Sequence, residues 1–167
     1  AFSPDIDRAA LWVGGSGFST FIERSTNYAT FSDGFILPQA YPERNDRAIL
    51  IAVCQHMWDA TDAETWLRFA ESGYGDEIGP FNILSTISIN DAQVPMLSSD
   101  RAARTAGIPV LNGSMWSPFG VDVADGPITG SAVVYWDGGY DSMPDTNAAP
   151  PTGDAGLAHN EIAPITQ

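Results

Sequence analysis

The segment FNILSTISINDAQVPML, residues Phe81 to Leu97, decides how this chain is interpreted. Its apolar and β-branched residues predict a buried strand over Phe81–Ile89. The strand pattern stops at the turn-forming pair Asn90 and Asp91, and a Val-Pro pair follows at residues 94–95. In open α/β sheets, ligands and catalytic side chains collect at the carboxyl ends of strands. Asp91 is therefore expected at the functional edge of a sheet.

Strands and helices are predicted to alternate along the rest of the chain. Further strands are expected over Arg8–Gly15, which reads as buried, and over Ile108–Leu111 and Ser131–Trp136. Helices are expected over Phe18–Ser25, from Asn45, from Thr61, and over Ser99–Ala106 with Gly107 closing it, and residues 27–43 are expected to form a loop. Asn45 is the expected cap of its helix, and Thr61 has capping-box spacing to Glu64. This alternation predicts an α/β fold with a mainly parallel sheet, in a single domain over residues 1–167.

The charge of the chain is strongly negative. It has 21 acidic residues and 7 basic ones, all Arg, for a net charge of −14 among 167 residues. Such a surface repels nucleic acid and anionic membranes, and we expect neither as a partner. We interpret the acidic residues as a solvated surface; the alternative is calcium binding by residues 122–145, which lack EF-hand spacing.

The sequence also bears on the cellular location of the protein. No apolar run is long enough to span a bilayer, and no signal peptide is recognisable. Because the first residue is Ala1 rather than Met, we expect this amino terminus to result from cleavage or truncation. An acidic, Lys-free chain of this kind favours export from a bacterium, to the periplasm or beyond.

Cysteine and histidine are scarce. Cys54 is the single cysteine, so no disulfide forms within the chain, and its apolar helical surroundings predict a buried, inert thiol. The two histidines are His56, expected in the middle of a helix in core or interface packing, and His159. With so few candidate ligands, a zinc site is not expected.

Asp91 and His159 are the candidate catalytic residues. Asp91 at a strand end can equally be a structural turn residue. His159 lies in GDAGLAHNEIAP, a polar segment after the last predicted strand, where a solvated loop histidine is the plain alternative. An acid after one strand and a histidine in a later loop match the acid–base half of a triad with the chain order Ser, Asp, His. The carboxylate would orient the imidazole, which would take the nucleophile's proton.

Several segments carry a family resemblance. ISINDAQVP resembles the acid-bearing turn of the α/β-hydrolase fold. The chain is similar, over most of its length and in the order of its segments, to the carboxyl-terminal half of a bacterial, serine esterase-like subgroup of that family. The segments that carry this similarity are SPDIDRAALWVGGSGFSTFIERS, MWD, DAQVPMLSSDRAARTAGIPVL, SAVVYWDGG and the Pro-rich segment before His159.

The resemblance implies a split active site. In that family the nucleophilic serine lies in a Gly-x-Ser-x-Gly elbow, upstream of the part that resembles SPDIDRAALWV. This chain would then supply Asp91 and His159, while a second polypeptide, either an amino-terminal fragment or a separate subunit, supplies the serine and the oxyanion hole. The implied reaction is hydrolysis of a carboxylic ester, with no cofactor.

Two alternatives stay open at this point. Ser16, in the sequence Gly14-Gly15-Ser16-Gly17-Phe18, precedes Asp91 and His159 in the required order, although the last glycine of the elbow is absent. We favour a glycine-rich turn there and keep Ser16 as the runner-up nucleophile. The chain can also be a non-catalytic structural or binding subunit with the same fold, a role for which neither candidate residue is needed.

Overall fold

The computed structural model describes residues 5–29, 36–145, 149 and 157–160. Its centre is a five-stranded, all-parallel sheet with the strand order β1-β2-β5-β3-β4. The strands are β1 (Arg8–Trp12), β2 (Asn82–Ser88), β3 (Val110–Leu111), β4 (Val123–Ala124) and β5 (Ala132–Trp136). Parallel pairing brings all the carboxyl ends of the strands to one edge of the sheet, which confirms the predicted α/β architecture.

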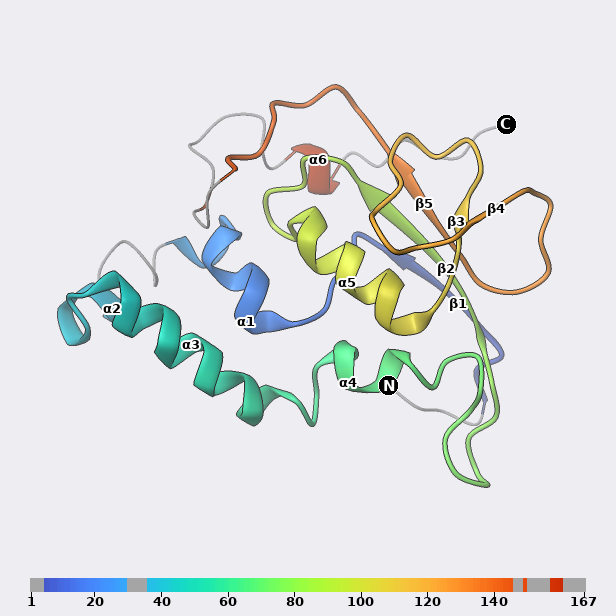
Figure 1. Ribbon diagram of the computed structural model, residues 1–167, viewed down its shortest axis with the longest axis horizontal. Coiled ribbons are helices and arrows are strands. Elements are labelled where there is room, and N and C mark those ends of the chain that lie inside the picture. Colours follow the sequence, from blue (N-terminus) through green and yellow to red (C-terminus); the bar gives the residue numbers. More distant parts are fainter. Residues whose placement is uncertain (1–4, 30–35, 146–148, 150–156, 161–167) are drawn as a thin grey trace.

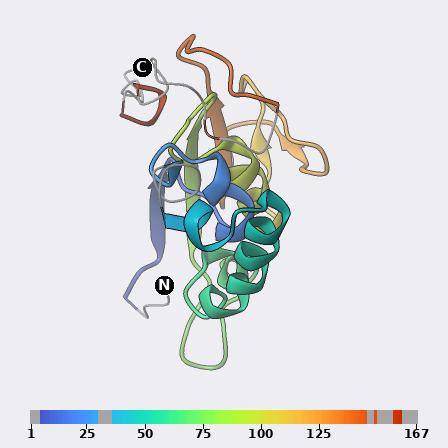
Figure 2. The same ribbon diagram turned by 90° about the vertical axis from the view of Figure 1, so that its left-hand side faces the viewer.

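Helices pack together on one side of this sheet (Figures 1 and 2). They are α1 (Phe18–Phe21), the 3₁₀ helix η1 (Ile22–Arg24), α2 (Ile36–Ala40), α3 (Arg44–Trp58), α4 (Ala63–Leu67) and α5 (Met96–Ala106); α6 (Leu157–Asn160) follows later in the chain. The connections from β1 to β2 and from β2 to β3 cross the sheet in the same direction. Right-handed crossovers that run in the same direction place their helices on the same face.

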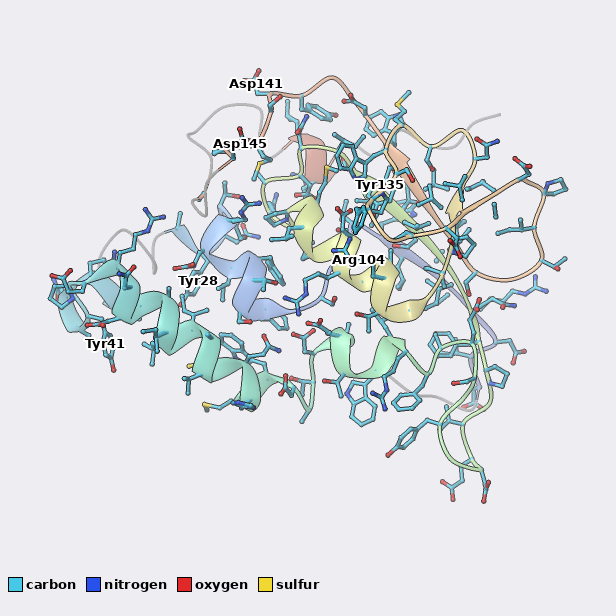
Figure 3. All side chains as sticks on the ribbon, in the orientation of Figure 1. Tyr28, Tyr41, Arg104, Tyr135, Asp141 and Asp145 are labelled. Atoms are coloured by element: carbon cyan, nitrogen blue, oxygen red, sulfur yellow. The ribbon has the colours of Figure 1, made fainter. Side chains whose placement is uncertain are left out.

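The core lies between α5 and the middle strands. It is formed by buried side chains from β2, β3 and β5 and from α5 and the turn after it: Ile87, Val110, Val133, Tyr135, Ala103 and Ile108. The hydroxyl of Tyr135 donates to Asp100 Oδ1 over 2.8 Å and so ties β5 to α5. Burial raises the pKa of Asp100, and this rise is only partly offset by the Tyr135 hydrogen bond and the Arg104 charge. Figure 3 shows Tyr135 and Arg104 close together beside α5.

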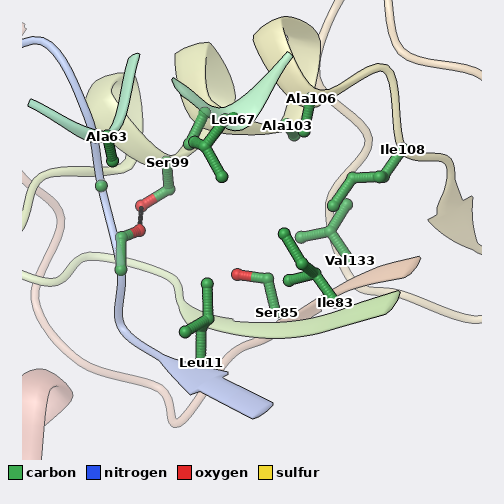
Figure 4. Close-up of a pocket in the computed structure, with 13 residues that line it drawn as sticks. Leu11, Ala63, Leu67, Ile83, Ser85, Ser99, Ala103, Ala106, Ile108 and Val133 are labelled. Carbon is green, nitrogen blue, oxygen red and sulfur yellow. Dashed lines mark hydrogen bonds between the residues drawn. The ribbon is translucent and has the colours of Figure 1, made fainter. Parts of the chain in front are cut away.

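A small apolar cavity remains between α4, α5 and the sheet (Figure 4). Its volume is about 60 Å³. Leu11, Ile83, Ser85 and Val133 line it from the strands, whereas the helices contribute mostly small side chains, among them Ala63, Ala103 and Ala106. The short side chains on the helices are the reason that this space is not filled.

Strand β1 is correctly predicted, but its burial is not. Among the described strands β1 pairs with β2 alone, so it forms an edge of the sheet. Trp12 is 68% exposed and Leu11 is 38% exposed. The apolar residues that suggested a buried strand therefore lie at an open edge.

Two helix caps differ from the predicted ones. Helix α3 begins at Arg44, and the N-cap position is Glu43 rather than Asn45. Asp62 rather than Thr61 caps α4, and it accepts a hydrogen bond from the backbone N–H of Glu64 over 3.0 Å. For α4, sequence spacing alone does not separate the adjacent residues Thr61 and Asp62, because both side chains carry an oxygen that can accept from the first turn.

Among the elements that precede β5, two short ones are absent from the prediction. Helix α2 lies inside the segment expected to be a loop, and β4 consists of two residues. Helix α5 begins three residues before the predicted start, directly after Pro95, and ends at Gly107 as expected, with φ 70° at that residue.

Helix α3 is more exposed than its composition suggests. Ile51 is its one buried residue, and Cys54 is partly exposed rather than buried. The His56 side chain is 88% exposed and its Nδ1 lies 3.7 Å from Asp59 Oδ2, so His56 does not pack in the core of this chain, while packing at an interface stays a prediction. The reason is that α3 lies at the outer side of the helical layer. None of the described helices is long and apolar enough to cross a membrane.

Candidate functional site

The turn after β2 holds Asp91 in a fixed orientation. Asn90 takes the left-handed conformation with φ 63°, which reverses the chain directly after the strand. Asp91 Oδ1 then accepts hydrogen bonds from the backbone N–H groups of Gln93 (2.8 Å) and Val94 (2.9 Å). The residue is 1% exposed, so its carboxylate is buried at the carboxyl edge of the sheet. This leaves Oδ2 as the oxygen available to another group.

His159 supplies that group. Its Nδ1 lies 2.8 Å from Asp91 Oδ2, although the two residues are 68 positions apart in sequence. His159 belongs to α6, a short helix rather than the predicted loop, and Figure 1 shows this helix beside the loop that joins β2 to α5. The adjacent Ala158 is fully buried and anchors α6, while the His159 side chain is 25% exposed. The structure thus brings the two predicted site residues together.

This contact determines what the imidazole can do. An ionised carboxylate can accept hydrogen bonds but cannot donate them. The ring nitrogen that faces it, Nδ1, is therefore the protonated nitrogen of the neutral ring, and Nε2 carries the lone pair. No described residue makes a hydrogen bond to Nε2. A partly exposed imidazole with this tautomer can accept a proton at Nε2, and the buried carboxylate stabilises the charge that results.

Ser16 does not meet the requirements of the nucleophile. It is 1% exposed, and its hydroxyl has no hydrogen-bond partner among the described residues, His159 included. Its backbone N–H donates to Ser98 O over 3.2 Å, which holds the β1–α1 turn against α5. The packing there is tight, because a Cβ at Gly15 would lie 2.7 Å from Val94 Cγ1. A hydroxyl enclosed in this way is out of reach of a substrate.

Sequence reasoning did not identify a polar segment that contacts the Asp91 turn. Ser25, Thr26 and Asn27, which follow η1, all form hydrogen bonds to Ala92 or Gln93. A run of Ser, Thr and Asn is a common loop composition. The sequence therefore contains no signal for which distant segment such a run contacts.

The described residues offer no obvious metal centre. They contain no group of three or more His, Cys, Asp or Glu side chains that could hold a metal ion, and residues 122–145 are within the described range. The apolar cavity under α4 and α5 is also separate from the candidate site, because neither Asp91 nor His159 lines it.

Comparison with protein-family models, with curated proteins and with solved structures found no match to this chain. The functional proposal therefore depends on the Asp91–His159 contact and on the motifs around it.

Proposed function

We propose that this chain is the acid- and histidine-bearing part of a serine hydrolase that acts on carboxylic esters, and that its sheet is part of an α/β-hydrolase-like fold. The observation that supports this most strongly is the 2.8 Å contact between His159 Nδ1 and the buried Asp91 Oδ2. A hydrogen bond of this kind fixes the base tautomer that acyl transfer to a hydroxyl nucleophile requires. Asp91 is thus the orienting acid and His159 the general base.

In the proposed reaction a serine hydroxyl attacks the ester carbonyl while His159 Nε2 takes the hydroxyl proton. The tetrahedral intermediate collapses when the C–O bond to the alcohol breaks, and the imidazolium returns the proton to the departing alkoxide. A water molecule then attacks the acyl-serine ester as His159 again removes a proton. The second tetrahedral intermediate collapses when the bond between the acyl carbon and the serine Oγ breaks, and the imidazolium returns its proton to that oxygen. This step releases the carboxylic acid and regenerates the serine hydroxyl, so no oxidant, metal or other cofactor takes part.

The serine is proposed to come from a second polypeptide. Two properties of the described chain support this. The best internal candidate, Ser16, is buried and not bonded to His159. The edge of β1 has no neighbouring described strand and exposes Leu11 and Trp12. A strand of the partner that pairs with β1 in parallel would end at the same edge of the sheet as the Asp91 turn.

Hydrolysis of a chromogenic short-chain ester by the natively purified protein tests this function. We expect His159→Ala to lower kcat/KM by about 10³-fold or more, because the base is lost. His56→Ala is the matched control, because His56 is the other histidine of the chain and is exposed on α3. If both variants are as active as the parent, His159 is not the base and the proposal is wrong.

A non-catalytic binding subunit is the competing function. It is favoured by a stripe of exposed apolar residues on α3, where Ile49, Val53 and Met57 are 62%, 59% and 79% exposed. Residues spaced four apart lie on one face of a helix, and such a face is typical of a protein contact. A native preparation that contains a partner but hydrolyses no ester would favour this second function.

A further inference from the structure

We propose that Ser25, Thr26 and Asn27 form a clamp that positions Asp91 toward His159. These three residues follow η1, and the sequence assigns no function to them. The clamp contributes to catalysis only if the proposed function holds, but its effect on the His159 ring is a property of this chain alone.

The clamp consists of four hydrogen bonds to the two residues after Asp91. Ser25 Oγ donates to Gln93 O over 2.7 Å. Thr26 donates twice to Ala92 O, from its backbone N–H at 2.8 Å and from Oγ1 at 3.2 Å. Asn27 Nδ2 donates to Gln93 Oε1 over 3.0 Å. The partners are 66 to 68 residues apart in sequence, so each bond joins two separate parts of the fold.

Three of these bonds satisfy backbone carbonyl groups that the hydrogen bonds of the sheet leave unpaired. The carbonyls of Ala92 and Gln93 lie beyond the end of β2, where none of the described strands pairs with them. Ala92 is fully buried and Ser25 is 3% exposed, so an unpaired carbonyl here would be costly. The clamp therefore fixes the backbone of the turn at two consecutive residues.

The position of the turn backbone determines where the carboxylate points. Asp91 Oδ1 is bonded to the backbone N–H groups of Gln93 and Val94, so the carboxylate follows any movement of these residues. Its other oxygen, Oδ2, makes the 2.8 Å contact with His159. The clamp residues touch neither the imidazole nor a reacting atom, and they act through the turn as positioning residues.

The segment that carries the clamp is also held at its start. Asp62 accepts hydrogen bonds from the backbone N–H groups of Gly17 (3.0 Å) and Phe18 (2.9 Å) at the start of α1. Helix α1 continues directly into η1, whose carbonyl at Ile22 accepts from the Ser25 N–H over 3.2 Å. The clamp thus belongs to a fixed segment rather than to an isolated loop.

The tautomer of His159 provides a direct test. In a His56→Gln background His159 is the only histidine, so long-range ¹H–¹⁵N spectra of the neutral imidazole report on it alone. We expect the parent to be mainly protonated at Nδ1. Ser25→Ala should lower the ratio of the Nδ1–H to the Nε2–H tautomer, by at most about fivefold, because only the part of the energy of one hydrogen bond that depends on the Asp91–His159 contact alters the ratio. Ser25→Thr, which keeps the hydroxyl, should restore the ratio.

Thr20→Ala is the matched control. Its hydroxyl belongs to the same segment but donates to Gly17 O over 2.7 Å and does not contact the Asp91 turn. This variant should leave the tautomer ratio unchanged, and an equal shift in Thr20→Ala would contradict a specific clamp. If Ser25→Ala does not fold, Thr26→Val removes one clamp hydroxyl while keeping the backbone bond. An unchanged ratio in whichever of these two variants is folded would overturn the clamp.

The same variants separate the clamp from the proposed function. The tautomer ratio needs no nucleophile, so a shift in Ser25→Ala supports the clamp even in a preparation that hydrolyses no ester. Where ester hydrolysis is present, Ser25→Ala should lower kcat by about fivefold with KM unchanged, because the substrate-binding surface is intact. Activity in the parent together with an unchanged tautomer ratio in Ser25→Ala would leave the hydrolase and reject the clamp.

Discussion

Asp91 uses its two carboxylate oxygens differently: Oδ1 closes its own turn and Oδ2 orients His159. Asp91→Asn can keep the turn bonds through its carbonyl oxygen, but its amide NH₂ then faces Nδ1 and favours the Nε2–H tautomer. We expect this variant to stay folded while kcat/KM for ester hydrolysis falls by about 10⁴-fold. Ester kinetics beside urea unfolding of the same sample check both parts.

Asp91→Ala should also unfold more easily, because the N–H groups of Gln93 and Val94 then lack their acceptor. We expect a loss of about 2 kcal/mol in the free energy of unfolding, compared with a small change for Asp91→Asn. If the two variants are equally stable, Oδ1 does not hold the turn as described.

Asn90 is the second residue of this turn with a specific requirement. Its φ of 63° is unfavourable for a β-branched side chain but open to glycine. Asn90→Val should lower the free energy of unfolding by about 1–2 kcal/mol. Asn90→Gly is the control for the loss of the hydrogen bond from Nδ2 to Tyr140 O (3.2 Å), and it should cost less than Asn90→Val. Chemical denaturation measures the free energy of unfolding of both variants. A larger loss in Asn90→Gly than in Asn90→Val would show that residue 90 does not need the left-handed conformation.

At the scale of elements, Asp62 connects the start of α1 with α3 and α4. Burial raises the pKa of Asp62, but hydrogen bonds from the backbone of Glu64, from Gly17, from the Gln55 side chain and from Phe18 outweigh it, so the pKa is below the usual value of 3.8. A carboxyl whose pKa is lowered by folding stabilises the protein above its unfolded-state pKa. This contribution is lost as the pH falls through the folded-state value.

Asp62→Asn should therefore be less stable than the parent at neutral pH, and the difference should narrow as the pH falls below about 4. Urea unfolding across that range measures it. Parallel stability profiles of the two proteins through the acid range would show that Asp62 is not stabilised as an anion.

The cavity between α4, α5 and the sheet allows a stabilising substitution. Ser85 points into this space from β2 (Figure 4). Ser85→Val adds apolar volume on a strand and should raise the free energy of unfolding by about 1 kcal/mol. Ser131→Val is the contrasting control, because the Ser131 hydroxyl accepts a hydrogen bond from Ile83 N over 3.0 Å and its loss should destabilise. Thermal unfolding of a Ser85→Val protein below the parent's midpoint would indicate overpacking instead.

The predictability of the elements differs for physical reasons. Strands β2 and β5 and helix α5 were predicted because a long apolar run or a terminal glycine defines each of them locally. The strand order and the open edge of β1 depend on pairing between distant segments, and composition does not encode that pairing. A buried Cys54 was predicted because apolar residues dominate the α3 segment, yet packing on one side leaves Cys54 partly exposed and Val53 and Met57 exposed.

At the scale of the whole molecule, the site combines a predictable part with an unpredictable one. Asp91 was identified from the sequence because it directly follows a predicted strand. His159 was identified because it is one of two histidines and lies in the polar segment after the last predicted strand. The clamp was not, because Ser25, Thr26 and Asn27 acquire their role from contacts 66 to 68 residues away. The Asp91–His159 pair can thus be found from the sequence more easily than the residues proposed to position it.

The central claim is that the Asp91–His159 pair serves a serine on another polypeptide. Intact-mass analysis of the native preparation after treatment with a fluorophosphonate tests it most directly, because this reagent labels serines activated by a neighbouring base. We predict one added label on a co-purifying polypeptide, none on this chain, and loss of that label in His159→Ala but not in His56→Ala. A label on this chain itself, or a label that persists in His159→Ala, would contradict the account.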